Sequence, residues 1–284
     1  MKGNHFYLTL PSNTSSDHYG PQNPNNYRTK LDHGISLDPE HWEVGLTELC
    51  YSKSWHNVPP CPFYLEHPAA QNERGVEMYT HGEFGGATYL SSKHLVRDFH
   101  LTLRDALPDA MQQSVRVRHD ELSNKAKFYL KKDYYVWMLT PLAKVLGLAS
   151  TMAGRLTGPG GEVGYIVPGA MGLDAEATSN MRESAYTVDV DRLLPTIYVY
   201  SDLVEQQHVG DNYVQLLRSV DVPPWQDLGG GDVVTQEFKH VHYVNLQTGN
   251  FESVQIKLND PRGKPVDFKH GNVTAKLHFR KKER

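Results

Sequence analysis

The sequence of 284 residues has few cysteines, no long apolar run and no excess of basic charge. Its two cysteines, Cys50 and Cys61, are too few for a disulfide scaffold and are typical of a reducing compartment with free thiols. No stretch of about 18 apolar residues is present, and Met1–Leu10 lacks the apolar core of a signal peptide. We therefore expect neither a transmembrane helix nor a signal peptide.

Motifs of metal sites are missing as well. His240-Val241-His242 places two histidines on one face of a predicted strand, as in a cupin-type metal site. That motif also requires a downstream glutamate and an upstream glycine, but Leu246, Gln247 and Val234 occupy the corresponding positions. We therefore expect no bound metal.

Binding of nucleotides or DNA is not predicted either. The glycine-rich segments 158–164 and 229–231 are not followed by Lys-Ser or Lys-Thr and do not open a helix after a strand, so they indicate flexible loops. The net charge of −4 argues against bulk binding of nucleic acid. The four basic residues within 280–284 are typical of a solvated chain end, so we expect no cofactor and no DNA contact there.

Short segments with β-strand patterning are what the sequence does contain, and they fill its last third. Because these segments do not alternate with helices, they predict an antiparallel β-sandwich. The predicted strands are His5–Leu10, Tyr27–Leu31, His41–Tyr51, Phe63–Glu66, Val115–His119, Ala126–Leu130, Tyr134–Leu139, Tyr165–Val167, Ala185–Val190, Ile197–Leu203, Tyr213–Val220, Val233–Phe238, Tyr243–Leu246, Val254–Leu258 and Val273–Phe279.

Helices are few. Leu95, Phe99 and Leu103 recur at helical spacing and predict a helix over Ser91–Leu107, which Ser91 can cap. A second, short helix is predicted over Leu142–Leu148.

One predicted strand contains an irregularity. Trp42, Val44 and Leu46 share one face of His41–Tyr51, and continued alternation would place Glu48 on that apolar face. The pattern favours a β-bulge at this point, and the alternative is that Glu48 lies at a subunit or sheet boundary.

Several segments of the chain, taken in order, resemble one group of viral proteins. The segments are Phe6–Asn13 (FYLTLPSN), Tyr27–Leu31 (YRTKL), Trp42–Glu48 (WEVGLTE), Leu139–Leu148 (LTPLAKVLGL), Ile197–Glu205 (IYVYSDLVE), Val209–Asp211 (VGD) and Lys276–Arg280 (KLHFR). In this order and spacing they resemble the minor capsid (penton) proteins of Polinton/Maverick elements and the related adintoviruses. Residues 66–135 and 150–185 lie outside the resemblance.

The resemblance implies a single jelly-roll domain over residues 1–284, built from eight strands in two sheets. Residues 66–184 would then be an insertion that carries the helix at 91–107. Residues 1–26 would form an extended N-terminal arm and loop that contacts a neighbouring subunit or the shell.

The same resemblance implies a structural virion protein and no enzyme. Five copies would form a ring that closes an icosahedral capsid vertex, through contacts of one flank of each subunit with the other flank of its neighbour. The implied partners are further copies of the chain, the major capsid protein of the same virus, and a host receptor or fibre. The protein would be made inside the host cell and located in the virion.

Aromatic residues are enriched at the centres of subunit interfaces, which suggests candidates for the ring contacts. The candidates at strand ends, in loops or at the irregular strand position are Glu48, Trp55, Tyr134, Tyr135 and Trp225. Ordinary core packing is the alternative for each aromatic residue.

Two other functions stay open at this point. A carbohydrate- or receptor-binding β-sandwich would use exposed Trp or Tyr beside Asp and Asn. A cupin-type metalloenzyme would use His240 and His242. The 15 histidines also suggest that an assembly would loosen near about pH 5–6, because their protonation adds positive charge.

Overall fold

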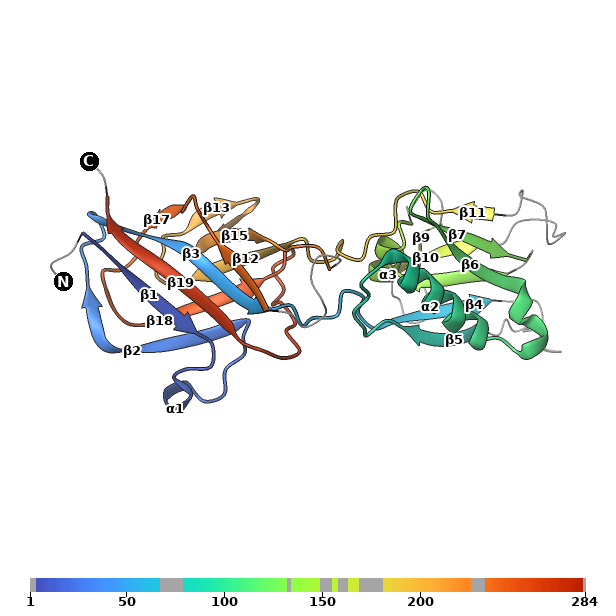
Figure 1. The fold of residues 1–284 in the computed structure, drawn as a ribbon, viewed down its shortest axis with the longest axis horizontal. Helices are drawn as coiled ribbons and strands as arrows, with labels where there is room; N and C mark the ends of the chain where they lie inside the picture. Colours follow the sequence, from blue (N-terminus) through green and yellow to red (C-terminus); the bar gives the residue numbers. More distant parts are fainter. Residues whose placement is uncertain are drawn as a thin grey trace. The chain divides into compact units, whose positions relative to one another are not determined.

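The computed structural model describes residues 4–66, 79–131, 134–148, 155–157, 163–168, 181–225 and 233–282. The chain divides into two compact units (Figure 1). Unit 1 comprises Met1–Trp55, Leu194–Pro223 and Leu228–Arg284, and unit 2 comprises His56–Leu193 and Pro224–Asp227.

The sandwich of unit 1 is formed by two antiparallel sheets. Sheet A has the strand order β1 (His5–Pro11), β19 (Val273–Lys281), β3 (Trp42–Ser52) and β16 (Val233–Glu237), and β17 (Tyr243–Asn245) also pairs with β3. Sheet B has the order β15 (Leu216–Asp221), β12 (Thr196–Ser201), β18 (Asn250–Asn259) and β2 (Asn26–Ser36).

The order of these strands is that of a jelly roll. β16 and β17 pair with successive parts of β3, so they occupy one strand position. In chain order, the eight strand positions are β1, β2, β3, β12, β15, β16 with β17, β18 and β19. Sheet A therefore has the order first, eighth, third, sixth, and sheet B has the order second, seventh, fourth, fifth. Two Greek keys wound in this way define the jelly-roll sandwich. The predicted all-β jelly-roll fold is confirmed.

The core of this sandwich is formed by the inward-facing side chains, which alternate with outward-facing ones along each strand. Val254, Ile256 and Leu258 of β18 are fully buried, and so are the alternate residues of β19 from Val273 to Phe279. The outward residues between them are polar, as expected for sheets with one solvated face.

The predicted irregularity in β3 is a β-bulge. Lys276 of β19 lies opposite Glu48, whereas Leu277 lies opposite Leu46, so Thr47 is the extra residue. The bulge resets the alternation, and Leu49, which would otherwise turn outward, is fully buried. Glu48 is partly exposed and forms an ion pair with Lys276 at 3.6 Å.

Unit 2 contains two further antiparallel sheets and the helices. One sheet has the order β5 (Tyr79–Phe84), β4 (Cys61–Glu66), β8 (Tyr135–Leu139), β10 (Val163–Pro168), β9 (Arg155–Thr157), and the other has β11 (Met181–Glu183), β7 (Lys125–Leu130), β6 (Val115–Asp120). The helices of this unit are α2 (Ser92–Asp105), α3 (Thr140–Val145) and the 3₁₀ helix η2 (Asp109–Ser114). Within the described ranges, no helix is long and apolar enough to cross a membrane.

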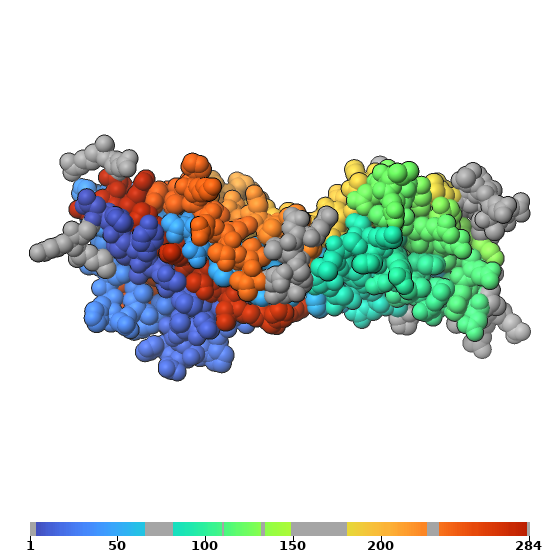
Figure 2. Space-filling model, viewed as in Figure 1, coloured from blue at the N-terminus to red at the C-terminus, as the bar shows by residue number. Residues whose placement is uncertain are grey.

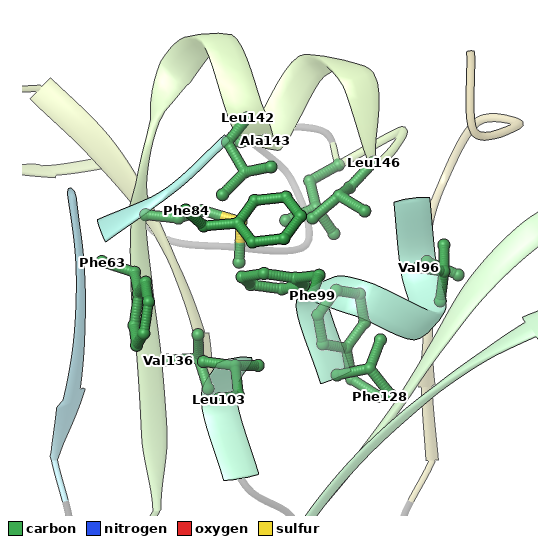
Figure 3. Packing of buried hydrophobic residues seen from close by; sticks show 14 of the residues in the cluster. Phe63, Phe84, Val96, Phe99, Leu103, Phe128, Val136, Leu142, Ala143 and Leu146 are labelled. Atoms are coloured by element: carbon green, nitrogen blue, oxygen red, sulfur yellow. The ribbon is translucent and has the colours of Figure 1, made fainter. Parts of the chain in front are cut away.

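Helix α2 supplies the centre of the unit 2 core (Figure 3). Its buried face carries Leu95, Val96, Phe99 and Leu103, and the Phe99 ring contacts the rings of Phe63 and Phe84 edge-on. The hydroxyl of Ser91 accepts a hydrogen bond from the backbone N–H of His94 at 3.3 Å and caps the helix. The predicted long helix is confirmed, with bounds shorter by a residue or two.

The jelly roll occupies unit 1, whereas the sequence suggested one domain over residues 1–284. Most of unit 2 lies between β3 and β12 in the chain, and the segment 66–184 that was predicted as an insertion falls inside it. Part of the predicted arm is a sheet strand: β1 pairs with β19 from His5 to Pro11, and the short helix α1 (Ser16–Tyr19) follows.

The predicted strand at Ala185–Val190 is wrong. The buried Val188 and Val190 mimic strand alternation, but their segment is a loop. The N–H of Val188 donates to the carbonyl of Asn124, and the N–H of Asp189 donates to that of Val145. Because successive residues bond to two separate segments, no ladder forms with either.

Candidate functional site

A cleft of about 730 Å³ lies on the outer face of sheet B in unit 1. Its floor is formed by outward side chains of β12 and β18. Its walls are the hairpin of β13 (Gln207–Val209) and β14 (Asn212–Val214) and the turn at Pro261–Gly263. Two parts of the chain that are distant in sequence, 198–215 and 255–263, therefore meet around it.

Alternation on the two floor strands decides which side chains reach the cleft. Ile197 and Val199 of β12 are buried in the sandwich, so Tyr198 and Tyr200 project to the opposite face. In the same way, Gln255 and Lys257 of β18 project outward.

Tyrosine rings are a main feature of the lining. Tyr198 and Tyr200 belong to the floor, and Tyr213 on the hairpin is 58% exposed, with its ring 4.9 Å from that of His208. Partial burial raises the pKa of the Tyr200 phenol, and the neighbouring Tyr198 adds to the effect. The Tyr200 hydroxyl therefore stays protonated at neutral pH and is available as a hydrogen-bond donor.

A network of charged and polar groups holds the floor in place. The guanidinium of Arg28 on β2 lies 3.1 Å from the Asp202 carboxylate and also donates to Ser253 Oγ and Gln255 Oε1. Asp202 accepts a further hydrogen bond from the backbone N–H of Gln255 at 2.9 Å. These bonds tie β2 and β18 to the end of β12.

The lining carries charges of both signs in equal number. Its carboxylates are Asp202 and Asp211, and its cations are Lys257 and Arg262. Arg262 bonds to Asp260 at 2.7 Å and thereby stiffens the turn. The cleft thus has no net charge that would select a strongly anionic or cationic ligand.

A second surface feature is an aromatic patch on the outer face of sheet A, made of His5, Tyr7, Tyr243, His278 and Arg280. The ring of His278 stacks on Tyr7 with centroids 4.4 Å apart, and the Arg280 guanidinium lies 3.7 Å from the Tyr243 ring centroid. This surface joins the first and last strands of unit 1, seen as adjacent blue and red atoms in Figure 2.

His278 is the polar centre of the aromatic patch. Its Nδ1 lies 2.7 Å from the Tyr243 hydroxyl, and its Nε2 is buried without a hydrogen-bond partner in the described part of the chain. Burial lowers the pKa of His278, and the positive charges of His5 and Arg280 lower it further. The folded chain therefore favours the neutral imidazole.

This lowered pKa predicts a loss of stability in acid. Unfolding restores the ordinary pKa near 6.5, so below that pH the unfolded chain binds more protons at His278 than the folded chain does. We expect the melting temperature to fall between about pH 7.5 and pH 5, and to fall less in His278→Phe, which keeps the ring packing. Differential scanning calorimetry measures both.

The control is His33→Phe on the exposed part of β2, which should leave the pH dependence unchanged. An equal pH dependence of melting in wild type and His278→Phe would contradict the assignment to His278.

The sequence-predicted interface residues are not gathered at either surface. Three of them, Trp55, Tyr134 and Trp225, are buried within the chain. The Trp55 ring packs on the rings of Tyr51 and Phe268, as expected for ordinary core packing. Glu48 and Tyr135 are partly exposed and remain predictions.

The histidine pair considered for a metal lies in the loop before β17. His240 and His242 are both exposed, and the carbonyl of His240 accepts a hydrogen bond from Arg218. Across the ranges that the structure describes, no three His, Cys, Asp or Glu side chains gather as metal ligands would. Cys50 and Cys61 are not joined in a disulfide bond.

The cleft was not predicted from the sequence, although two of its segments belong to the resemblance described above. Ile197–Glu205 contributes the floor tyrosines, and Val209–Asp211 contributes the hairpin wall. The alternation Tyr198-Val199-Tyr200 was the available signal, because it places two large aromatic rings on the solvated face of a strand.

Comparisons with known proteins identify similar folds. No family profile matches the sequence, and no curated protein is significantly similar to it. Among solved structures, the mavirus penton protein aligns with a TM-score of 0.51 and 10% identity, over 99% of this chain and 100% of that chain. A chain of the Sputnik virophage aligns with a TM-score of 0.46 and 10% identity, over 99% of this chain and 98% of that chain. In its fold, the chain is similar over nearly its whole length to the mavirus penton protein.

Proposed function

We propose that this chain is a structural virion protein, a penton (minor capsid) protein of a Polinton- or adintovirus-like virus or element. The observation that carries the proposal is the fold likeness to the mavirus penton protein, which extends over the whole of both chains. The jelly-roll strand order of unit 1 supports it, because many capsid proteins are built on this sandwich.

Under this proposal, the role of the chain is geometric. Five copies form a ring at a capsid vertex, and the ring contacts the major capsid protein of the same particle. A closed ring requires that one flank of each copy binds the opposite flank of the next. The edge strands of unit 1 supply such flanks: β1 and β16 end sheet A, and β2 and β15 end sheet B.

Tyr7 is the side chain we assign to the ring contact on the β1 flank. It lies on the edge strand of sheet A, is 51% exposed and is stacked on His278, which holds the ring in a fixed orientation. A rigid, half-exposed tyrosine is typical of the centre of a protein interface.

Light scattering on a sizing column tests the proposal. One chain has a mass of 32.2 kDa, and we expect a species of about five times that mass. Tyr7→Asp should shift this species toward the monomer, because it places a charge in the contact. The control is Tyr186→Asp in unit 2, an exposed tyrosine at 54%, which should leave the pentamer intact.

A dimer, trimer or hexamer would contradict the proposal. If the isolated chain is a monomer, the test moves to particles assembled with the major capsid protein. Absence of the chain from the five-fold vertices in electron cryomicroscopy of those particles would then refute the vertex role.

A further inference from the structure

We propose that the cleft on sheet B is a carbohydrate-binding site for a neutral oligosaccharide, with Tyr200 and Tyr213 as the stacking residues. This inference does not depend on the penton proposal, because every residue that lines the cleft belongs to unit 1 of a single chain. It would give the surface of the protein a second activity, the attachment to glycans.

The size and position of the cleft favour a ligand that binds through side-chain contacts and not through backbone hydrogen bonds. Its volume of about 730 Å³ is within the range of small-ligand sites. The floor strands β12 and β18 are the two middle strands of sheet B, and each is already paired on both sides. A bound peptide therefore cannot add to them as a further strand, which is how extended peptides usually bind a sheet.

The tyrosines match the apolar face of a sugar ring. A pyranose presents C–H groups on its faces and hydroxyl groups around its rim, so it is recognised by a flat apolar surface surrounded by hydrogen-bonding groups. Tyr213 supplies an exposed ring on the hairpin, and Tyr200 supplies a half-buried ring on the floor with a protonated hydroxyl. Tyrosine loses little conformational entropy when it takes part in such contacts.

The remaining polar groups match the hydroxyl rim. A sugar hydroxyl both donates and accepts hydrogen bonds, so its site needs both kinds of partner. Asp211 accepts a hydrogen bond from the Asn212 amide at 2.7 Å, and the Asn259 amide donates to the carbonyl of Gly263 at 3.2 Å. The second carboxylate oxygen of Asp211 and the remaining donor and acceptor positions of the two amides can serve a sugar hydroxyl.

Charge argues for a neutral ligand. Two carboxylates and two cations line the cleft, so an extended polyanion such as heparin or nucleic acid gains no net attraction there. The hydrogen bonds of Arg28 with Asp202 and Gln255 fix the floor in advance, which reduces the entropy that binding must overcome.

A glycan array tests the inference. The full chain, made tetravalent on streptavidin, is applied to an array of neutral hexose- and N-acetylhexosamine-terminated oligosaccharides, sialylated oligosaccharides and heparin fragments. We expect binding to a subset of the neutral glycans. Tyr213→Ala and Tyr200→Ala should each weaken that binding about tenfold, the effect of losing one good aromatic contact.

The matched control is Tyr19→Ala. Tyr19 belongs to unit 1 and is 41% exposed, but it lies on α1 and does not line the cleft. The inference is overturned if no neutral glycan binds, if heparin alone binds, or if Tyr213→Ala binds as well as Tyr19→Ala. Because Tyr213 is exposed on a hairpin, its removal leaves the sandwich folded, and circular dichroism of each variant verifies this.

Discussion

Replacement of Phe99 by alanine is expected to remove about 3–5 kcal/mol from the stability of unit 2. Phe99 is fully buried on α2, and its ring centroid lies 5.0 Å from that of Phe84 and 6.2 Å from that of Phe63 (Figure 3). The substitution deletes an aromatic ring at a point where helix and sheet meet, and the cavity cannot collapse without moving both. Domains are stable by only about 5–15 kcal/mol, so this loss is large.

Hydrogen exchange followed by mass spectrometry locates the effect. Peptides from β4, β7 and α2 should exchange faster in Phe99→Ala, while those from β3 and β19 keep their protection. Arg97→Ala is the control on the exposed face of the same helix, with an expected change within about 0.5 kcal/mol. Equal loss of protection in β3 and β19 would show that the two units unfold together.

Replacement of Trp55 by alanine should destabilise unit 1 by a similar amount, about 3–5 kcal/mol. The Trp55 side chain is 5% exposed, with its ring 6.0 Å from Tyr51 and 5.6 Å from Phe268. Urea unfolding should therefore show a lower midpoint. Tyr135→Ala, at a partly exposed position, should have a smaller effect.

The same variants separate the two interpretations of Trp55 that the sequence left open. A core residue changes the unfolding midpoint at every protein concentration. An interface residue changes mainly the association of subunits. If Trp55→Ala altered the mass measured by light scattering but not the midpoint of the dilute monomer, the core assignment would be wrong.

Much of the fold followed from local patterns. The alternation in β18 and β19 predicted both strands, and the conflict at Glu48 predicted the bulge, because a strand with one buried face cannot tolerate a register change without an extra residue. The apolar stripe of Leu95, Phe99 and Leu103 predicted α2.

The features that were predicted wrongly or not at all depend on contacts between segments that are distant in sequence. The strand pattern at Ala185–Val190 was misleading, because backbone partners in two other segments hold that stretch as a loop. The insertion predicted over residues 66–184, with its helix at 91–107, stays a prediction, but the pairing of the strands in this region into two sheets around a core of their own was not predicted. Strand order depends on which segments meet, and local periodicity carries no information on that.

The candidate site was hidden for the same reason. Tyr200, Tyr213 and Arg262 belong to a strand, a hairpin and a turn, and only the sandwich brings them to one cleft. The aromatic interface candidates were selected for residue type, and type alone does not distinguish a buried Trp55 from a half-exposed Tyr7.

The place of β19 in sheet A has a consequence for synthesis of the protein. β19 lies between β1 and β3, so the two strands remain separated from their shared partner until residues 273–281 have left the ribosome. The main segment of unit 2 is contiguous in the chain and emerges earlier, so it can fold first. During that interval, the unpaired edges of β1 and β3 are exposed to other nascent chains. Expression at low temperature or with chaperones should therefore raise the yield of folded protein by protecting these strands until β19 arrives.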